Sequence, residues 1–477
     1  MENFFGTNGL FNTTLTAVND VLWTYLLIGA LIACGLWFTV RTGFVQFRMF
    51  AEMVRLLKEE GAQIGLSTKR HISPFKAFCI SLASRVGTGN LAGVATAIAV
   101  GGPGAVFWMW VIALIGAATA FVESTLAQLF KQRSTDSFIG GPAYYIRKGL
   151  KSRWMAAAIA VLMTLSFGMA NNSVQANTIC GAINDICGVQ PMIMGIVLAV
   201  MTLFVAFGGV QRVAHVSSII VPLMAVGYLI LAIVVIAMNW RLVPDVLTLI
   251  VENAFGVNQA IGGTVGAAIM NGVKRGLFSN EAGEGSAPNA AATATTSHPV
   301  KQGLIQSLGV FTDTLVVCSC TAFIILLSGL YDTPELNGIN LTQAALRQEV
   351  GSIGPMFVAI AIFLFAFSSM VGNYYYGEAN VRYLTQSRVV MTTYRILSGG
   401  VFVIFGAAVT LEVVWNVIDL CMALLTACNL AAICVLGKYV FRLVDDYRQQ
   451  RRNGVRSPEY HRSTIPELHD VTECWPD

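Results

Sequence analysis

The sequence predicts an all-α protein that crosses a membrane many times, because it is too apolar for a soluble domain and its apolar runs have helical length. Of its 477 residues, 55% are hydrophobic and 12% are charged, and the mean hydropathy is +0.66. Soluble domains carry about 25% charged residues. Most apolar runs have roughly 18 residues or more, which suits membrane helices and excludes the alternating strands of a membrane β-barrel.

Eleven apolar segments predict eleven membrane helices joined by short connections. The expected helices are 21–40, 73–99, 105–130, 153–180, 191–208, 215–238, 258–296, 302–330, 354–381, 390–410 and 413–440. One alternate set of connections holds 23 Lys and Arg residues, whereas the other set holds only Arg241 and Arg347. Because basic residues concentrate in cytoplasmic connections, we predict an outer N-terminus and a cytoplasmic C-terminus.

The second expected helix contains "RVGTGNLAGV", Arg85 to Val94, which does not suit a simple spanning helix. Gly87 and Gly89 weaken a helix, and Asn90 places an amide that needs a partner at membrane depth. Unwound backbone is tolerated there where it is buried in protein or lines a watery cavity. Its freed carbonyls suit a cation, and its N–H groups suit an anion. Close helix packing through small residues is the alternative.

The seventh expected helix is interrupted as well, by "KRGLFSNEAGEGSAPNAAATA", Lys274 to Ala294. Glu, Gly, Asn and Pro residues fill the middle of this run. Ionisable groups at membrane depth are expensive, and they indicate function rather than simple spanning. A water-exposed loop is the alternative interpretation, but it would leave the apolar residues 287–296 without a role.

The two breaks occupy matching positions in two five-helix halves of opposite orientation. Paired interrupted helices in inverted halves indicate the binding site of a secondary transporter. No nucleotide-binding loop of the Walker type is present, so coupling to an ion gradient is expected instead of ATP. The expected organisation is a short outer N-terminus (1–20), an extra helix (21–40), a cytoplasmic amphipathic linker (41–72), a first five-helix repeat (73–238), an outer loop (239–257), a second five-helix repeat (258–441) and a cytoplasmic tail (442–477).

Several motifs resemble one known family along nearly the whole chain. "GGPGAVFWMWVIALIG" (101–116) resembles the signature of the alanine or glycine:cation symporter family (AGCS, the sodium:alanine symporter family). "RVGTGNLAGVA", "FSNEAGEGSAPNAAA" and "FAFSSMVGNYYYGE" (365–378) resemble further blocks of that family. The resemblance implies the LeuT-type five-plus-five inverted-repeat fold with one extra N-terminal helix. It also implies sodium-coupled uptake of small neutral amino acids, mainly alanine or glycine.

The resemblance also implies a sodium site and a carboxylate site at the first break. The substrate carboxylate would meet the backbone N–H groups of Gly87, Thr88 and Gly89, beside Asn90. The sodium ligands would be the carbonyls of Ala83 and Val86 and the hydroxyls of Ser368 and Ser369. Sodium is a hard cation that prefers oxygen, so these ligands suit it without a carboxylate. Alternatively, each serine hydroxyl bonds back to the preceding helical turn.

Four further positions are expected to line the substrate pocket. Gln175 resembles a substrate-contacting position of the family, although an interhelical hydrogen bond explains it equally well. Phe278 and Ser279 begin the second break, and would supply an apolar wall and a polar contact. Many family members carry Trp where this chain has Asn373, which makes serine or glutamine plausible substrates beside alanine and glycine.

The charged residues near the breaks are candidates for gating ion pairs. An isolated charge in the bilayer is costly, so Arg85 and Arg275 would pair with Glu281, Glu284 or Glu378. A proton-coupled carrier would use one of these carboxylates as a relay, and proton coupling remains the alternative to sodium.

Other classes of protein fit less well. A channel would need pore-lining repeats or an oligomeric filter. An enzyme would need a nucleophile–base pair or a metal cluster, and no Cys or His spacing suggests one. We expect no enzymatic activity, no cofactor beyond Na⁺ as coupling ion, and no nucleic-acid partner. The predicted location is a prokaryotic plasma or inner membrane, with a monomer favoured. Cys180 and Cys187 flank a short connection, and whether they pair is left open.

Overall fold

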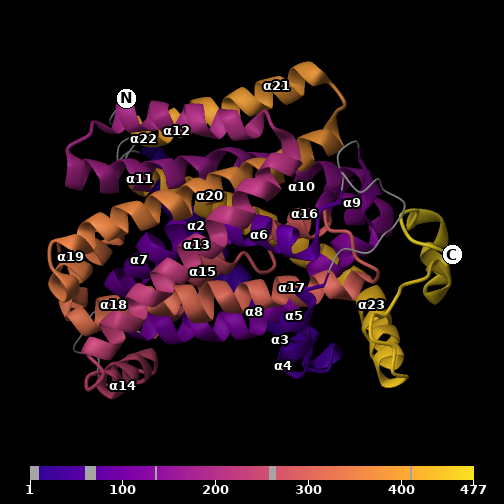
Figure 1. The fold of residues 1–477 in the computed structure, drawn as a ribbon, viewed down its shortest axis with the longest axis horizontal. Coiled ribbons are helices and arrows are strands. Elements are labelled where there is room, and N and C mark those ends of the chain that lie inside the picture. Colours follow the sequence, from indigo (N-terminus) through magenta and orange to yellow (C-terminus); the bar gives the residue numbers. More distant parts are fainter. Residues whose placement is uncertain (1–9, 60–70, 135–136, 257–264, 409–410) are drawn as a thin grey trace.

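The computed structural model describes residues 10–59, 71–134, 137–256, 265–408 and 411–477 (Figure 1). Within these ranges the regular secondary structure is helical apart from one antiparallel pair of two-residue strands, β1 (Gln132–Arg133) and β2 (Phe138–Ile139). The predicted all-α class is therefore confirmed. Most long helices run along the horizontal axis of Figure 1, with α14 and α19 near one end and the C-terminal tail at the other.

The helices follow the predicted order, and both expected breaks are present. The first half contains α2 (Leu10–Val21), η1 (Leu22–Leu27), α3 (Ile28–Arg41), α4 (Val45–Arg48), α5 (Phe50–Leu56), α6 (Pro74–Arg85), η3 (Gly89–Gly93), α7 (Val94–Gly101), α8 (Gly104–Leu129), α9 (Pro142–Tyr145), η4 (Ile146–Leu150), α10 (Arg153–Leu165), η5 (Ser166–Asn171), α11 (Asn172–Cys187), α12 (Pro191–Ala206) and α13 (Gly209–Met238). The second half contains α14 (Val243–Ala254), α15 (Val265–Asn280), α16 (Ala287–Ala291), α17 (Pro299–Val310), η6 (Phe311–Cys318), α18 (Ser319–Ser328), η7 (Leu330–Asp332), α19 (Gly338–Val350), α20 (Ile353–Leu384), α21 (Arg388–Ile396), η8 (Leu397–Val401), α22 (Phe402–Ala408), α23 (Leu411–Arg452), η9 (Arg462–Thr464) and η10 (Pro466–Val471).

Eight of the described helical stretches are long and apolar enough to cross a membrane, and Gly89–Gly101 and Pro191–Ala206 are shorter apolar helices. The first helix begins earlier than predicted, because α2 already packs on α23 before residue 21. There the Asn19 Nδ2 donates to the carbonyl of Asn416 at 2.9 Å, and the indole of Trp23 donates to that of Asp419 at 3.2 Å. Residues 1–9 of the expected outer N-terminus and residues 258–264 of the expected seventh helix lie outside the described ranges.

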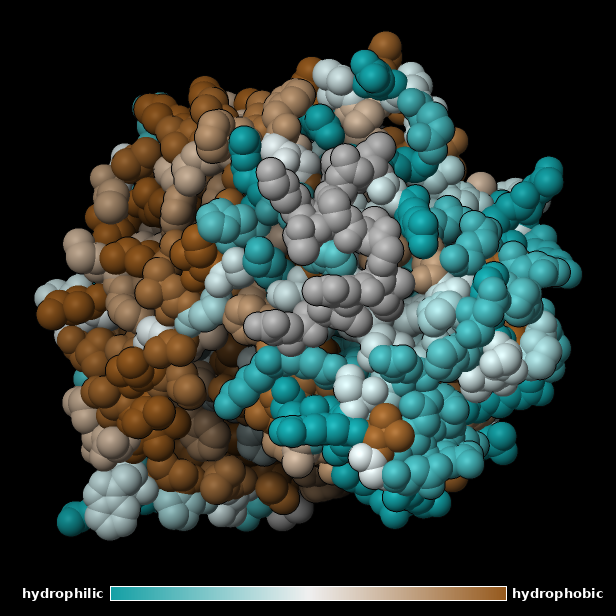
Figure 2. Space-filling model, turned by 45° about the vertical axis from the view of Figure 1, so that its right-hand side comes forward, coloured by the Kyte–Doolittle hydropathy of each residue, from teal (hydrophilic) through white to brown (hydrophobic). Residues whose placement is uncertain are grey.

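Large apolar side chains cover much of the surface along α12 and α13. Phe204 and Val200 on α12 are 70% and 63% exposed, and Leu223 on α13 is 65% exposed. Figure 2 shows a broad hydrophobic face that borders a polar end of the molecule. Soluble monomers rarely expose contiguous apolar patches of this kind. Lipid tails are the natural solvent for this face, as expected for a multi-pass membrane protein.

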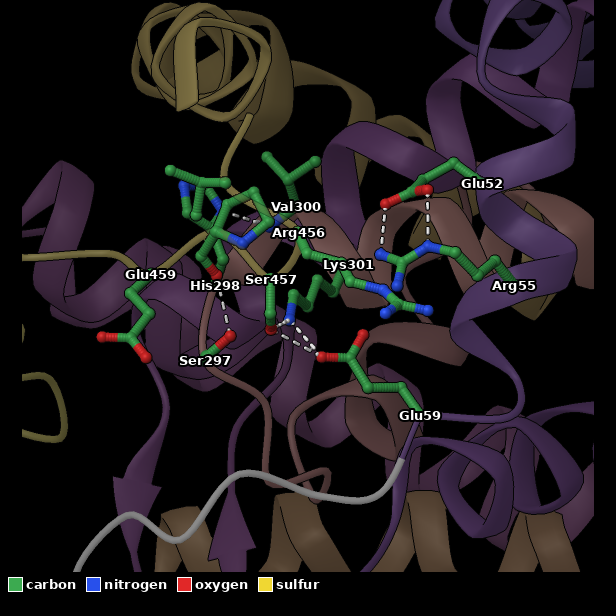
Figure 3. Close-up of polar contacts among 12 residues, drawn as sticks. Glu52, Arg55, Glu59, Ser297, His298, Val300, Lys301, Arg456, Ser457 and Glu459 are labelled. Carbon is green, nitrogen blue, oxygen red and sulfur yellow. Dashed lines mark hydrogen bonds and ion pairs between the residues drawn. The ribbon is translucent and has the colours of Figure 1, made fainter. Parts of the chain in front are cut away.

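The tail after α23 folds back on the polar end of the molecule. The backbone N–H of Tyr460 donates to the carbonyl of Ser297 at 2.9 Å, and the hydroxyl of Ser297 donates to the carbonyl of Pro458 at 2.8 Å. The ammonium of Lys301 lies between Glu59 and Ser457 (Figure 3). These contacts join the linker, the tail and the start of α17.

Aromatic burial explains why the tail docks. Trp475 is 3% exposed, and its indole N–H donates to the carbonyl of Leu129 at 3.1 Å. The Lys131 ammonium lies 4.4 Å from the Trp475 ring centre, in cation–π range. Burying an aromatic side chain stabilises a docked segment by roughly 1.5–3 kcal/mol. The mostly polar composition of the tail gives no sign of this contribution.

Candidate functional site

The first helix break begins at Val86, whose backbone is extended with φ −80° and ψ 91°. The N–H of Gly87 donates to the Oδ1 of Asn90 at 2.9 Å instead of continuing the helical ladder. The carbonyl of Ala83 would otherwise accept that hydrogen bond. The N–H of Asn90 donates to the carbonyl of Gly87 at 3.2 Å, and not to the carbonyl of Val86 one turn earlier. The carbonyls of Ala83 and Val86 are therefore released from the helix.

Ser369 on α20 lies directly on these released carbonyls. Its Oγ is 2.9 Å from the carbonyl oxygen of Ala83 and 3.3 Å from that of Val86. The neighbouring Ser368 donates to the carbonyl of Phe365 at 2.8 Å and lies 3.6 Å from the sulfur of Met224 on α13. The Ser369 hydroxyl also lies 3.1 Å from the Phe365 carbonyl, so both hydroxyls reach back to the preceding turn, but within the described residues only Ser369 also reaches the released carbonyls. The structure therefore brings Ser369, but not Ser368, to the expected sodium ligands.

The second break is a buried, unwound turn rather than an exposed loop. It begins at Glu281, which has φ +56°, and continues through Gly283 and Gly285 with φ +93° and +82°. Residues 279–295 are all buried. Three left-handed positions within five residues prevent a continuous helix, and glycine adopts two of them without strain.

A carboxylate on α8 holds this second break in place. Glu123 accepts hydrogen bonds from the backbone N–H groups of Gly283 and Gly285, at 3.2 and 3.1 Å. Asn429 on α23 donates to Glu123 at 2.7 Å and to the carbonyl of Gly283 at 2.8 Å. From the sequence, neither Glu123 nor Asn429 was assigned a role. A carboxylate within the long apolar run of 105–130 was the only available signal.

The two breaks meet face to face at Gly89. A Cβ on Gly89 would lie 3.0 Å from the ring of Phe278 and 3.2 Å from the Cα of Ser279, which is closer than ordinary packing permits. Phe278 and Ser279 are 5% and 0% exposed, so the expected pocket is closed in this conformation. The absence of a side chain at Gly89 is therefore what lets the breaks approach.

Gln175 on α11 reaches the first break. Its Oε1 accepts from the N–H of Thr88 at 2.9 Å, and its Nε2 donates to Asn171 at 2.8 Å. The Thr88 N–H is one of the donors that the resemblance assigns to the substrate carboxylate. In this structure the Gln175 amide oxygen already accepts the hydrogen bond of that N–H.

Asn373 lies one turn beyond Ser369 and contacts a different group. Its Oδ1 is 2.6 Å from the hydroxyl of Ser84, which is also 2.7 Å from a carboxylate oxygen of Glu281. The structure thus groups Asn373 with Ser84 and Glu281 at the ends of α6 and α15. Among the described residues, the Nδ2 of Asn373 has no hydrogen-bond partner.

The expected gating pairs are absent from the described residues. Arg275 pairs with Asp419 at 3.2 Å, because the register of α15 turns this side chain toward α23. Glu378 pairs with Arg382, one turn along α20, at 2.5 Å. Arg85 forms no ion pair in the described part of the chain and donates to the carbonyl of Gln306 at 3.1 Å.

The two remaining carboxylates near the second break differ in their contacts. Glu281 accepts hydrogen bonds from Ser84 and, at 2.6 Å, from Ser286. Glu284 is fully buried, and neither of its carboxylate oxygens has a hydrogen-bond partner among the described residues. Cys180 and Cys187, whose pairing the sequence left open, are both free thiols.

Comparison with known proteins identifies the family. A model of the sodium:alanine symporter family matches residues 8–462. The chain is 53% identical over 460 residues to the probable sodium/glutamine symporter GlnT of Bacillus subtilis, covering 96% of this chain and 95% of that protein. It is 49% identical to the amino-acid carrier protein AlsT of the same species, covering 100% and 99%. It is 36% identical to the sodium/alanine symporter AgcS of Methanococcus maripaludis, covering 94% and 99%.

Two solved structures share the fold at low sequence identity. MhsT in complex with L-phenylalanine superposes with a TM-score of 0.54 at 13% identity, covering 86% of this chain and 96% of that one. A Na⁺-coupled sialic acid symporter also has a TM-score of 0.54, at 14% identity, covering 98% and 97%. The predicted LeuT-type fold is therefore confirmed. The chain belongs to the sodium:alanine symporter family, and is a multi-pass sodium-coupled amino-acid symporter of a prokaryotic plasma membrane rather than an enzyme.

Proposed function

We propose that this protein couples the uptake of a small neutral amino acid, namely alanine, glycine or serine, to sodium entry by alternating access. The observation that carries the proposal is the juxtaposition of the two breaks at Gly89 and Phe278, with Ser369 on the carbonyls that the first break releases. A LeuT-type carrier places its substrate and its ion at such breaks.

The sodium ion would be held by the carbonyls of Ala83 and Val86 and the hydroxyl of Ser369. The Ser369 Oγ lies 2.9 and 3.3 Å from the two carbonyl oxygens, and rotation of its hydroxyl would turn its lone pairs toward an ion. We infer that a bound sodium ion would replace the hydrogen bonds of the Ser369 hydroxyl as the link between α20 and the first break. Sodium binding would then fasten the break against α20 and order the backbone that receives the substrate.

The substrate would bind between the breaks. Its carboxylate would accept hydrogen bonds from the N–H groups around Thr88 once the amide of Gln175 has moved aside. Its side chain would lie against Phe278. Because Gly89 and Phe278 are already in close contact, the space between them suits a small side chain. Closure of the occupied site and rocking of the helices would then expose it to the other side.

Glutamine is the second candidate substrate. The sodium/glutamine symporter GlnT is 53% identical to this chain, and Asn373 replaces the bulky residue of many family members. However, Asn373 contacts Ser84 rather than the facing breaks, so a larger pocket would require the α20 turn around Asn373 to rearrange.

Proton coupling is the alternative to sodium coupling. The burial of Glu284 without hydrogen-bond partners among the described residues favours it. An ionised carboxylate buried without partners is unfavourable by several kcal/mol, so Glu284 needs a proton or a cation in this conformation. If Glu284 exchanges that proton during transport, Glu284→Gln would abolish coupling to pH while leaving sodium-dependent binding intact.

The decisive experiment is binding of a panel of L- and D-amino acids to the purified full-length protein, in sodium and in potassium. We expect alanine, glycine or serine to bind in sodium only, and calorimetry would give their affinities. Preferential binding of glutamine would replace the proposed substrate. Equal binding in sodium and potassium would refute sodium coupling and direct attention to Glu284. Because linkage is reciprocal, the amino acid must raise the apparent sodium affinity by the same factor.

A further inference from the structure

Three arginines line a cavity where α20 ends and α21 begins. The cavity has a volume of about 370 Å³, and the charged residues of its wall are Arg382, Arg388 and Arg395. Met391 is the one apolar residue of the wall, and no acidic residue lines it among those that the structure describes. From α19, α20 runs toward the end of the molecule that carries the C-terminal tail (Figure 1). Because basic connections concentrate on the cytoplasmic side, the cavity is expected to open there.

The residues of α21 that line the cavity form one face of the helix. This face begins at Arg388 and ends at Arg395, and its members follow the spacing i, i+3, i+4 and i+7. Val389 and Ile396 lie one position further around the helix, and they are 75% and 48% exposed. A short helix with a basic face and an exposed apolar face suits the boundary between lipid tails and water.

Positive charge at the cavity exceeds negative charge among the described residues. Glu378 is 1% exposed and pairs with two of the arginines, with Arg382 at 2.5 Å and with Arg395 at 3.4 Å. Arg388 has no ion-pair partner in the described part of the chain. A single exposed arginine is simply hydrated, but like charges gathered on one wall repel each other. The wall is therefore expected to attract an anion.

Arg395 is held in place before any ligand binds. Its Nε donates to the hydroxyl of Tyr374 at 3.1 Å, and its guanidinium lies 5.5 Å from the ring centre of Phe207. A guanidinium has five N–H donors in a planar fork, and the contacts with Tyr374 and Glu378 use two of them. The remaining donors suit phosphate oxygens, which arginine binds in pairs. The first turn of α21 begins beside the cavity, and its N–H groups also favour an anion.

The surroundings of the cavity favour the phosphate of a lipid over a soluble phosphate. Phe207, at the end of α12, is 53% exposed and contacts the guanidinium of Arg395. Leu384, in the last turn of α20, is 42% exposed. An apolar surface therefore begins directly at the arginines. A soluble phosphate gains nothing from such a surface, whereas a phospholipid buries its acyl chains against it. Basic pockets on the cytoplasmic side of membrane helices suit anionic headgroups.

We propose that this cavity binds an anionic phospholipid of the cytoplasmic leaflet. Its phosphodiester group accepts hydrogen bonds from Arg388, from Arg395 and from the first turn of α21, and its acyl chains lie against the neighbouring exposed apolar side chains. The inference goes beyond the proposed function, because it depends on neither the transported substrate nor the coupling ion. A bound headgroup would join α21 to the inner end of α20, the helix that carries Ser369.

The test measures lipid binding to the purified full-length protein in a neutral detergent. Mass spectrometry of the intact protein with its bound lipids gives an apparent Kd for phosphatidylglycerol and for phosphatidylcholine. We expect phosphatidylglycerol to bind more tightly, because the headgroup of phosphatidylcholine carries a compensating positive charge. One arginine near the membrane surface changes the affinity for anionic lipid by about fivefold. Arg388→Gln should therefore raise the Kd for phosphatidylglycerol by about that factor or more and change the Kd for phosphatidylcholine far less.

Arg48→Gln is the matched control. Arg48 ends α4 in the predicted cytoplasmic linker, is exposed like Arg388, and has the exposed residues Phe47 and Phe50 beside it, but it does not line the cavity. The Kd for phosphatidylglycerol should not change in this variant. If both variants raise the Kd equally, the lipid responds to the general surface charge and the assigned site is wrong. An unchanged Kd in Arg388→Gln would also refute the proposal.

Glycerophosphoglycerol distinguishes a lipid site from a site for a soluble phosphate, because it is the same headgroup without acyl chains. We expect it to bind far more weakly than phosphatidylglycerol, and equal affinity would overturn the assignment to a lipid. The melting temperature in detergent shows whether each variant is folded. If Arg388→Gln does not fold, Thr392→Glu adds a carboxylate to the same wall and keeps all three arginines. It should weaken phosphatidylglycerol binding, and full affinity would refute the proposal.

Discussion

Gly89 illustrates how one missing side chain determines the geometry of the site. The nearest atoms to a Cβ at this position belong to Phe278 and Ser279, at 3.0 to 3.2 Å, and both lie on the last turn of α15, directly before the second break. Gly93, four residues further along the same stretch, has its nearest neighbour at 3.8 Å. Two glycines of one motif thus have different roles. Gly89 permits the contact between the breaks, and Gly93 has ordinary space around it.

We predict that Gly89→Ala abolishes or strongly weakens amino-acid binding, because the methyl group pushes the two breaks apart. Overpacking of this kind is unfavourable by about 1–3 kcal/mol. Gly93→Ala is the matched control and should bind as the unaltered protein does. Calorimetry in sodium measures both. Equal affinities for the two variants would show that the breaks do not need this approach.

Ser369→Ala should raise the sodium concentration required for half-maximal substrate binding by about tenfold or more, since it removes an oxygen ligand of a charged group. Ser368→Ala should raise it far less, because that hydroxyl faces Phe365 and Met224. Sodium titrations at fixed alanine concentration distinguish the two. A larger effect of Ser368→Ala would mean that α20 turns before the ion binds.

At the scale of elements, the start of α17 shows how a helix terminus joins distant segments. His298 is the N-cap residue, and its Nδ1 accepts from the N–H of Val300 at 3.2 Å. Its Nε2 lies 3.1 Å from a carboxylate oxygen of Asp446. The Nδ1 accepts a hydrogen bond only when it carries no proton, so the cap requires a neutral imidazole. Burial lowers the pKa of His298, which favours the same form.

We predict that acidification below about pH 6.5 destabilises this cap. The unfolded chain takes up a proton on His298 near pH 6.5, whereas the folded protein does so at lower pH. The unfolded state therefore binds more protons in that interval, and the free energy of unfolding decreases as the pH falls. Melting temperatures between pH 7.5 and 5.5 measure the effect. His298→Asn keeps a capping acceptor without a titrating ring and should show a shallower decline. An identical decline in both proteins would contradict the prediction.

At the scale of the whole molecule, the predicted orientation in the membrane rests on the distribution of basic residues. The fold alone does not test this orientation. Cys187 offers one. It ends α11 in a connection predicted to face outward, and it is the exposed member of ten free cysteines. A thiol reagent that cannot cross the membrane would therefore reach Cys187 only from the outer side.

We expect a membrane-impermeant maleimide to label intact cells through Cys187, and Cys187→Ser to eliminate that labelling. Mass spectrometry of the labelled peptide gives the site. In inverted vesicles the same thiol should be protected. The opposite pattern would show that the N-terminus is cytoplasmic and would reverse the predicted orientation.

Sequence reasoning was most successful where the signal is local. Glycine, asparagine and glutamate within apolar runs located both breaks, because such residues weaken a helix or are unfavourable in lipid wherever they occur. It failed where partners lie far apart in sequence. Glu123 and Asn429 hold the second break across 306 residues, and neither position carries a local pattern that names the other. For the same reason, the sequence did not indicate that Arg275 pairs with Asp419 or that Glu378 pairs with Arg382 in this structure.

The sequence by itself determined the membrane class, the family and the positions where two helices unwind, since hydropathy, motif and helix propensity are properties of contiguous residues. The tertiary structure decided which atoms meet. It selected Ser369 over Ser368 through the rotation of α20, and it turned Asn373 toward Ser84. These outcomes depend on the register of packed helices, and a shift of one residue on a helix rotates a side chain by about 100°.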